Sequence, residues 1–242
     1  VYDDISGWNT LPYLGAGEFY LEYGTFDVHI NSPADHLVVC SGELLNPEDV
    51  YTDTQLKRLE QAAKSDETVL IRSVDEINDP NSRPQDKDRL TWKFRIENSR
   101  DVAWSSSKAF IMDAARINLP SGEKSMAISV YPEESNSMDS WARSTEYTKA
   151  SIEHYSEKWL EYPYPAAINV AGNEGGMEYP GIVFCNYKDG LNRVSDYLNS
   201  KHLNHSCFHG DMEQIDREKA LVKFRNGTHQ LLLATDLAAR GL

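Results

Sequence analysis

The short apolar run Ile182–Cys185 separates two parts of the chain whose residue patterns require different folds. Before it, apolar and polar residues mostly alternate, a period that is typical of half-buried antiparallel strands. After it, apolar runs alternate with amphipathic stretches in the order strand, helix, strand, helix, strand, which favours a parallel sheet with crossover helices. The run itself has the composition of a buried strand. It could therefore belong to a sheet formed by the residues before it or to a sheet formed by the residues after it.

Strands dominate the pattern of the first 110 residues. Trp92, Phe94 and Ile96 alternate with charged residues, as in a strand with one buried face. The sequence also predicts strands over 18–30, 37–40 and 68–73, a helix over 56–64 and a solvated loop over 75–88.

A long amphipathic helix is predicted over residues 137–161. It rests on the spacing of three, four and seven residues among Trp141, Thr148, Ile152, Tyr155 and Trp159. Strands are predicted on both sides of it, at 126–131 and 168–171. In the last part of the chain we expect strands over 182–185, 206–209 and 230–235 and helices over 189–200 and 213–224.

The net charge of −14 is unevenly distributed over the 242 residues. Residues 182–242 hold eight Lys and Arg against seven Asp and Glu, so the first 181 residues carry −15. So acidic a body is not attracted to nucleic acid over long range, whereas the last part is not repelled by it. Three cysteines without paired spacing predict packed thiols, and no apolar run approaches the roughly 18 residues of a membrane span, so we expect no membrane partner.

The motif Gly175-Gly176-Met177-Glu178 follows Tyr162-Pro163-Tyr164-Pro165 and, further upstream, Asp101-Val102-Ala103-Trp104. With these segments, residues 1–185 resemble the gluzincin, aminopeptidase N-like, zinc metallopeptidases. The resemblance implies that Glu178 binds the free α-ammonium group of a peptide by charge-assisted hydrogen bonds. The glycines would let the peptide backbone approach as an added strand. Tyr179 stands where the family usually has Asn, and most such strings on their own are an ordinary turn and strand.

Zinc is the cofactor of that family, and it requires a helix bearing HExxH. None of the seven histidines lies in such a motif, and His202, His205 and His209 have no acidic partner at helical spacing. The sequence therefore predicts part of a peptide-binding site, with no metal ligands and no catalytic residues.

Four ordered motifs begin with the apolar run: Ile182–Asn186, Phe208–Asp211, Gln214–Arg217 and Ala234–Gly241. Together they resemble the C-terminal RecA-like domain of DEAD-box RNA helicases. The resemblance implies that Gly210, Asp211, Gln214 and Thr235 lie along the RNA path and that Arg217 braces that surface. It also implies that Arg240 and Gly241 couple RNA binding to ATP. A helix cap at Thr235 and a surface ion pair at Arg217 are the structural alternatives.

ATP and Mg²⁺ are the cofactors of the complete helicase family. The sequence contains neither a GxxxxGK[ST] phosphate loop nor an Asp-Glu-Ala-Asp motif, so we expect no cofactor to be held by this chain alone.

The fold class predicted from both resemblances is mixed. It comprises the C-terminal part of an antiparallel β-domain (1–110), the start of a thermolysin-like α+β catalytic domain without its zinc helix (111–181) and a truncated α/β RecA-like domain with a parallel sheet (182–242). The predicted function is a truncated aminopeptidase-like protein joined to part of an ATP-dependent RNA helicase, catalytically inactive as printed. The alternatives are a DEAD-box helicase fragment that contributes RNA and ATP contacts, or a non-catalytic β-rich binding module.

Partners and compartment follow from these alternatives. A peptide N-terminus and weakly bound RNA are the expected partners. A helicase origin predicts a cytoplasmic location and a peptidase origin an exported one.

The junction within a buried strand predicts a chimeric reading frame, because natural fusions join domains at exposed linkers. A natural fusion and deliberate engineering are the alternatives. Sequencing one continuous genomic DNA molecule across codons 170–195 distinguishes them, since an intact genomic junction would contradict an assembly artefact.

Overall fold

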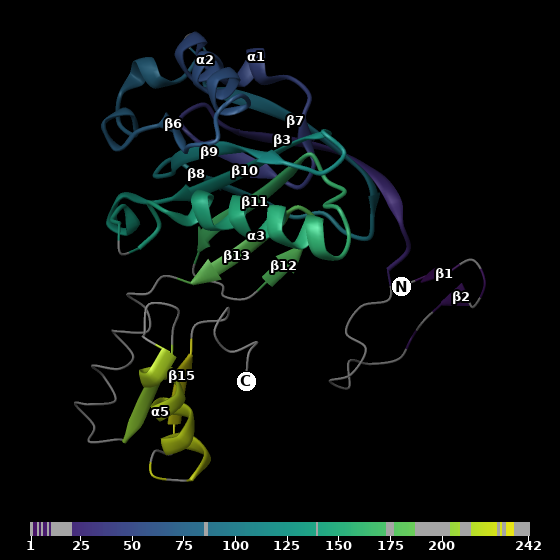
Figure 1. Ribbon diagram of the computed structural model, residues 1–242. Coiled ribbons are helices and arrows are strands. Elements are labelled where there is room, and N and C mark those ends of the chain that lie inside the picture. The colour runs from purple at the N-terminus through teal and green to yellow at the C-terminus, as the bar shows by residue number, and fades with distance from the viewer. Residues whose placement is uncertain are drawn as a thin grey trace.

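A six-stranded mixed sheet is the largest element of the computed structural model (Figure 1). The structure describes residues 2–3, 5, 7–8, 10, 21–84, 87–138, 140–172, 177–186, 204–208, 214–226, 228 and 231–234. The sheet has the order β12-β13-β11-β10-β9-β6. Its strands are β6 (Val69–Arg72), β9 (Ile111–Asn118), β10 (Lys124–Tyr131), β11 (Ala166–Gly172), β12 (Met177–Tyr179) and β13 (Ile182–Asn186). The pairs β10–β11 and β11–β13 are parallel and the other three pairs are antiparallel.

Smaller antiparallel sheets form most of the N-terminal part. One has the order β3-β7-β5, a second pairs β4 with β8, and a third pairs β1 with β2. Alternation explains β7, in which Trp92, Phe94 and Ile96 are buried and the charged residues between them are exposed. The strands are β1 (Tyr2–Asp3), β2 (Gly7–Trp8), β3 (Gly24–Pro33), β4 (Leu37–Cys40), β5 (Glu43–Leu44), β7 (Arg89–Ser99) and β8 (Trp104–Ser107).

Local hydrogen bonds set the start of the second helix. The described helices are α1 (Pro47–Val50), α2 (Asp53–Ala62), α3 (Ser144–Lys158) and α5 (Gln214–Arg225), with 3₁₀ turns η1 (Val74–Glu76), η2 (Pro80–Ser82) and η3 (Glu133–Ser135). α2 begins three residues before the predicted residue 56, because Thr52 and Gln55 form a capping box with bonds of 3.0 and 3.3 Å.

The predicted solvated loop over residues 75–88 is partly wrong, since it contains most of η1 and all of η2. Ser82 is buried, and its carbonyl accepts a hydrogen bond of 2.9 Å from Gln55 Nε2. A buried carbonyl needs such a partner, and the side chain of α2 supplies it.

The two faces of the large sheet pack against different layers. Met112, Val130, Ile168 and Ile182 share one face and join a core cluster with residues of the N-terminal sheets, among them Trp92. Alternate residues of β9, β10 and β11 face α3, which lies across the opposite face (Figure 1). The arrangement is therefore three layers: antiparallel strands, mixed sheet and helix.

The helix predicted over 137–161 is only partly right. The observed helix α3 is shorter and buries a different side. It begins at Ser144, and Trp141 lies before it in a turn, buried against Tyr131. Tyr155 and Trp159 were predicted to be on the buried face, but the Trp159 residue is 75% exposed. Small polar residues contact the sheet instead.

One of these contacts is a buried polar network between α3 and the sheet. Asp113 of β9, 3% exposed, accepts hydrogen bonds from Tyr131 Oη at 2.6 Å and from the Thr145 hydroxyl. Thr145 Oγ1 also lies 2.8 Å from Ser129 Oγ. Burial raises the pKa of Asp113 to about 6, although both hydrogen bonds act to lower the pKa.

The last part of the chain forms a separate β-α-β unit. β14 (His205–Phe208) and β15 (Leu231–Ala234) pair in parallel, as predicted, and α5 contacts both strands. The apolar run, which the sequence could assign to either sheet, forms β13 and pairs with β11 of the large sheet. β13 pairs along the edge of β11, and the Ile182 side chain packs into the main core cluster beside it. The predicted helix over 189–200 lies outside the described residues.

The mixed α/β character of the prediction is confirmed. The large sheet takes β6 from the first predicted domain, β9–β12 from the second and β13 from the third. The limits at 110 and 181 and the thermolysin-like assignment stay predictions. Among the described residues, no helix has the length and apolar character needed to cross a bilayer.

Replacing Ile182 with Ala should lower the free energy of unfolding by about 2–5 kcal/mol, because it leaves a cavity in the main core cluster. Urea denaturation of the whole chain measures this. Leu70→Ala on the exposed edge strand is the matched control, expected within about 0.5 kcal/mol of wild type. Equal effects of both changes would contradict the placement of β13 in this core.

Asp113 should make the protein less stable as the pH rises. Its folded pKa of about 6 lies above the ordinary 3.8, so between these values the folded state holds a proton that the unfolded state has lost. From pH 4 to 7, wild type should lose roughly 2.4 kcal/mol relative to Asp113→Asn, at about 1.4 kcal/mol per pKa unit. Urea denaturation across this range tests it, with exposed Asp75→Asn as control; a parallel pH profile for wild type and Asp113→Asn would be the contrary result.

Candidate functional site

The edge of the large sheet carries the described half of the predicted peptide-binding motif. β12 is the terminal strand of the sheet and pairs antiparallel with β13, with Glu178 opposite Val183. Pro180 and Gly181 connect the two strands, and the φ of +77° at Gly181 is typical of the third position of a type II turn. Met177 and Tyr179 are half-buried and Glu178 is exposed. Gly175 and Gly176 lie outside the described residues.

The register places Glu178 on the same face as α3. Glu178 pairs with Val183, which pairs with Asn169, whose side chain donates to the Thr148 hydroxyl on α3. Tyr179 packs against the main core on the opposite face. Because side chains of neighbouring strands in register share a face, the carboxylate lies on the helix-covered side at the outermost strand.

The described residues contain no group of three or more His, Cys, Asp or Glu side chains that could hold a metal ion. The described edge of the sheet carries the backbone groups of β12 and the exposed residue Glu178.

The β-α-β unit brings together the first residues of two helicase-like motifs. Phe208 and Ala234 are paired, so both parallel strands end at the same edge of their sheet. The next residues along the chain are the predicted RNA contacts at Gly210, Asp211 and Thr235. These three, with Arg240 and Gly241, lie outside the described residues.

Two further predicted residues lie on α5. Gln214 is its first residue and Arg217 lies one turn later, so the backbone places both on one side of the N-terminal turn. The N-terminus of a helix has unpaired backbone N–H groups and a partial positive charge, which suit a phosphate. The roles predicted for both residues stay predictions.

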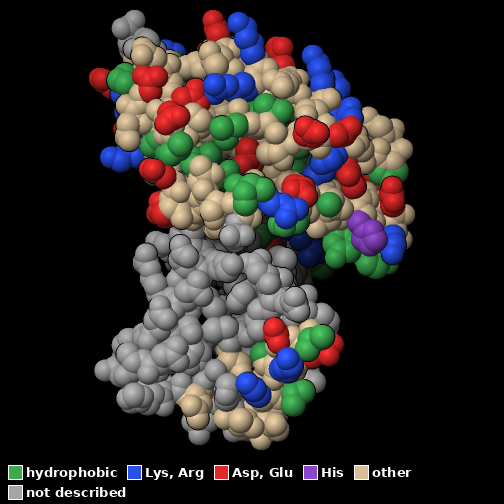
Figure 2. All heavy atoms as spheres, turned by 60° about the vertical axis from the view of Figure 1, so that its left-hand side comes forward, with side chains coloured by type: hydrophobic (Ala, Val, Ile, Leu, Met, Phe, Trp, Pro, Cys, Tyr) green, Lys and Arg blue, Asp and Glu red, His purple; other side chains and the backbone are tan. Residues whose placement is uncertain are grey.

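The surface charge is mixed. On α5 the exposed Asp216 and Lys219 form an ion pair of 3.1 Å, with exposed Glu218 and Lys223 on the same helix. Figure 2 shows Lys and Arg side chains interspersed with Asp and Glu on this face of the large body. Neither arrangement is a broad basic field, so any attraction to RNA would depend on local contacts.

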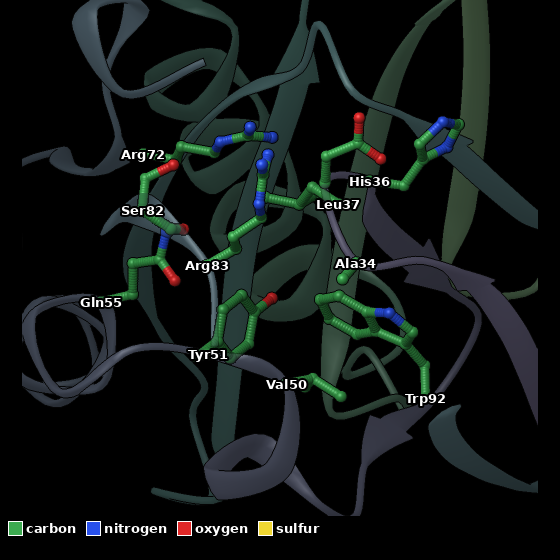
Figure 3. A pocket seen from close by; sticks show the side chains of 11 residues that line it. Ala34, His36, Leu37, Val50, Tyr51, Gln55, Arg72, Ser82, Arg83 and Trp92 are labelled. Atoms are coloured by element: carbon green, nitrogen blue, oxygen red, sulfur yellow. The ribbon is translucent and has the colours of Figure 1, made fainter. Parts of the chain in front are cut away.

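Sequence reasoning missed a cluster around Arg72. A small pocket behind β4 and β6 is lined by cationic, aromatic and polar side chains, including Arg72, Arg83, Tyr51 and Trp92 (Figure 3). The available signal was an arginine at the end of the otherwise apolar strand Val69–Arg72. Its significance depends on packing partners distant in sequence.

Comparison with known proteins finds a similarity in the last part of the chain. The family model of the helicase conserved C-terminal domain matches residues 169–242, just under a third of the chain. That range also includes most of β11 and all of β12 and β13.

Curated relatives give the same result. The ATP-dependent RNA helicase DbpA of Escherichia coli (strain K12) is 49% identical over 61 residues, which cover 25% of this chain and 13% of the relative. The ATP-dependent RNA helicases eIF4A of Mycosarcoma maydis and DBP3 of Coccidioides immitis (strain RS) are 41% and 46% identical over 61 residues, again 25% of this chain and 15% and 12% of those proteins. The chain thus spans about an eighth of the length of these relatives, and its C-terminal segment is similar to the helicase C-terminal domain of RNA helicases.

Proposed function

We propose that the C-terminal segment is an RNA-contacting part of a DEAD-box-type RNA helicase. The observation that carries this is the 49% identity over 61 residues to an ATP-dependent RNA helicase. The parallel pairing of β14 and β15 supports it, because loops at the carboxyl ends of parallel strands are where such sheets bind ligands.

In this proposal the segment binds the RNA backbone. Backbone N–H groups at Gly210 and Asp211 and the Thr235 hydroxyl donate to phosphate oxygens, and Gln214 contributes from the start of α5. Contacts of this kind set position on the strand without reading its sequence. Arg217 braces the surface that carries them.

ATP chemistry requires groups that the printed sequence does not contain, namely a phosphate loop and an Asp-Glu-Ala-Asp motif. Arg240 and Gly241 would contribute to coupling only beside a second domain that supplies those groups. We therefore propose RNA contact without ATP hydrolysis for this chain alone.

Single-stranded RNA should bind weakly, and binding should fall as salt is raised. Only a cationic contact releases counter-ions, and Arg217 is the one cation among the residues of the proposed path, so the slope of log K against log [salt] should be shallow, at about −0.7. Thr235→Val removes one hydroxyl and should weaken binding about 2- to 10-fold, the equivalent of about 0.5–1.5 kcal/mol for one hydrogen bond. Fluorescence anisotropy with a labelled oligonucleotide measures both.

Thr228→Val is the matched control, since Thr228 is exposed in the turn before β15 and hydrogen-bonds within that turn to Asn226. It should bind RNA as wild type does. Equal losses in both variants, or no salt dependence, would contradict the proposed path.

A second function, binding of a peptide N-terminus, is favoured by the position of β12 at the sheet edge. An edge strand presents backbone groups that an extended peptide can pair with, and the carboxylate of Glu178 on that strand would attract a free α-ammonium group. The proposal for this edge is binding of the peptide and not its hydrolysis. It follows the resemblance of residues 1–185 to gluzincin aminopeptidases.

A short peptide with a free N-terminus should therefore bind more tightly than its N-acetylated form. Glu178→Gln should remove most of that difference, because it removes the charge that the ammonium group is attracted to. Glu157→Gln, an exposed position on α3 with the same change in charge, is the control. Isothermal titration with both peptides measures the effect, and the same affinity for both in wild type would exclude this function.

A further inference from the structure

Arg72 is a buried cation with one N–H group that lacks an acceptor. The residue is 4% exposed. Its Nη1 donates to the Phe110 carbonyl at 3.4 Å and its Nη2 to the Ile77 carbonyl at 3.1 Å. Its Nε has no hydrogen-bond partner among the described residues. A buried donor without an acceptor is costly, so the surroundings of Arg72 Nε call for one.

The charge of Arg72 is compensated by carboxylates, so the partner that Nε requires is not a counter-ion. Burial has the largest effect on the pKa of Arg72 and lowers it, whereas Glu76 and Asp35 raise it. Arg83 acts against these two carboxylates, but it has an interaction partner of its own. What remains to be supplied is a neutral hydrogen-bond acceptor.

Neither carboxylate bonds directly to Arg72. Glu76 accepts two hydrogen bonds from Arg58 Nη1, at 2.7 and 2.9 Å, and one from the Ser73 backbone at 2.8 Å. Asp35 lines the same pocket as Arg72 and attracts it, yet the hydrogen bonds of that guanidinium go to the two carbonyls. Polar groups that interact across such a gap are a frequent setting for a bridging water.

The pocket has room for one water molecule. Its volume is about 20 Å³, and a single water requires roughly 10–15 Å³. Leu37, Val50 and Trp92 form buried walls, whereas Asp35 is half-buried. Figure 3 shows the side chain of Arg72 reaching into this space. A donor and an acceptor on the lining provide the two polar partners that a buried water needs.

A second buried donor competes for this water. Trp92 Nε1 also lacks a hydrogen-bond partner within the described part of the chain. Figure 3 shows the indole nitrogen on the Ala34 side of the pocket, away from Arg72. Because a charged donor forms the stronger hydrogen bond, the position beside Arg72 is favoured.

We propose that this pocket binds one water molecule that bridges Arg72 Nε and the Asp35 carboxylate. The water accepts the hydrogen bond of Nε and donates one of its own to the carboxylate, so the two residues form a water-separated ion pair. The bridge connects β6 of the large sheet with the turn before β4, and it therefore ties the mixed sheet to the antiparallel layer.

A crystal structure of the full chain, at a resolution that shows ordered water, tests the site directly. We expect one water at about 2.7–3.2 Å from Arg72 Nε and within hydrogen-bond distance of the Asp35 carboxylate. The proposal is overturned if no water lies there, or if the water lies beside Trp92 Nε1 and not beside Arg72.

A double-mutant cycle tests the same water in solution. Val50→Ile adds one methyl group to a buried wall of the pocket, and displacing the water leaves Nε without an acceptor. This change should lower the Tm of wild type by roughly 3–8 °C more than it lowers the Tm of Arg72→Met, which has no such donor. Strain from overpacking contributes to both backgrounds and cancels in the comparison.

Val39→Ile is the matched control, because Val39 is a buried valine of β4 outside the pocket lining. Its effect on Tm should be the same in both backgrounds. An equal loss of Tm for Val50→Ile in wild type and in Arg72→Met would contradict the proposal.

If Arg72→Met does not fold, crystals of two Asp35 variants replace the cycle. Asp35→Asn keeps an acceptor oxygen and should keep the water, whereas Asp35→Ala removes the acceptor and should lose it. Equal occupancy of the water in both variants would refute the bridge.

Discussion

The parallel ladder between β11 and β13 connects the two parts of the chain. Five residue pairs, from Ile168–Ile182 to Gly172–Asn186, join a strand from each side of the sequence boundary. The ladder also positions β12, which has β13 as its partner, and it places Ile182 at 1% exposure in the main core. The position of the edge strand β12 and the closure of the core both depend on this one pairing.

The use of β13 by the large sheet has a consequence for the helicase-like unit. The described part of that unit has a sheet of only two strands, covered by one helix. Two strands bury little apolar surface, and a small unit of this kind gains little stability on its own. The RNA contact proposed for this unit therefore requires that a two-stranded sheet hold the contacting residues in place.

Buried charged side chains lie on both faces of the large sheet at β9 and its neighbour β6. On one side Asp113 is held by hydroxyl groups from β10 and α3, and its pKa is raised by burial. On the other side Arg72 of β6, paired in register with Met112, reaches a pocket of the N-terminal layer. Asp113 can lose its charge by taking up a proton, whereas arginine stays charged.

The sequence by itself determined the elements whose burial follows a regular period. β10, β14, α5 and β15 were predicted within one or two residues, because alternation and helical spacing are local properties. The start of α2 required a capping pair, and the buried side of α3 could not be predicted, because small hydroxyl residues rather than Tyr155 and Trp159 meet the sheet.

The helicase-like motifs likewise stand in the sequence, as do Met177 and Glu178. Only the tertiary structure decided which sheet takes Ile182–Asn186, that β12 is an edge and that Arg72 meets Arg83, Trp92 and Tyr51. These results depend on pairing and packing between residues far apart in the chain, which no local pattern of charge or hydrophobicity encodes.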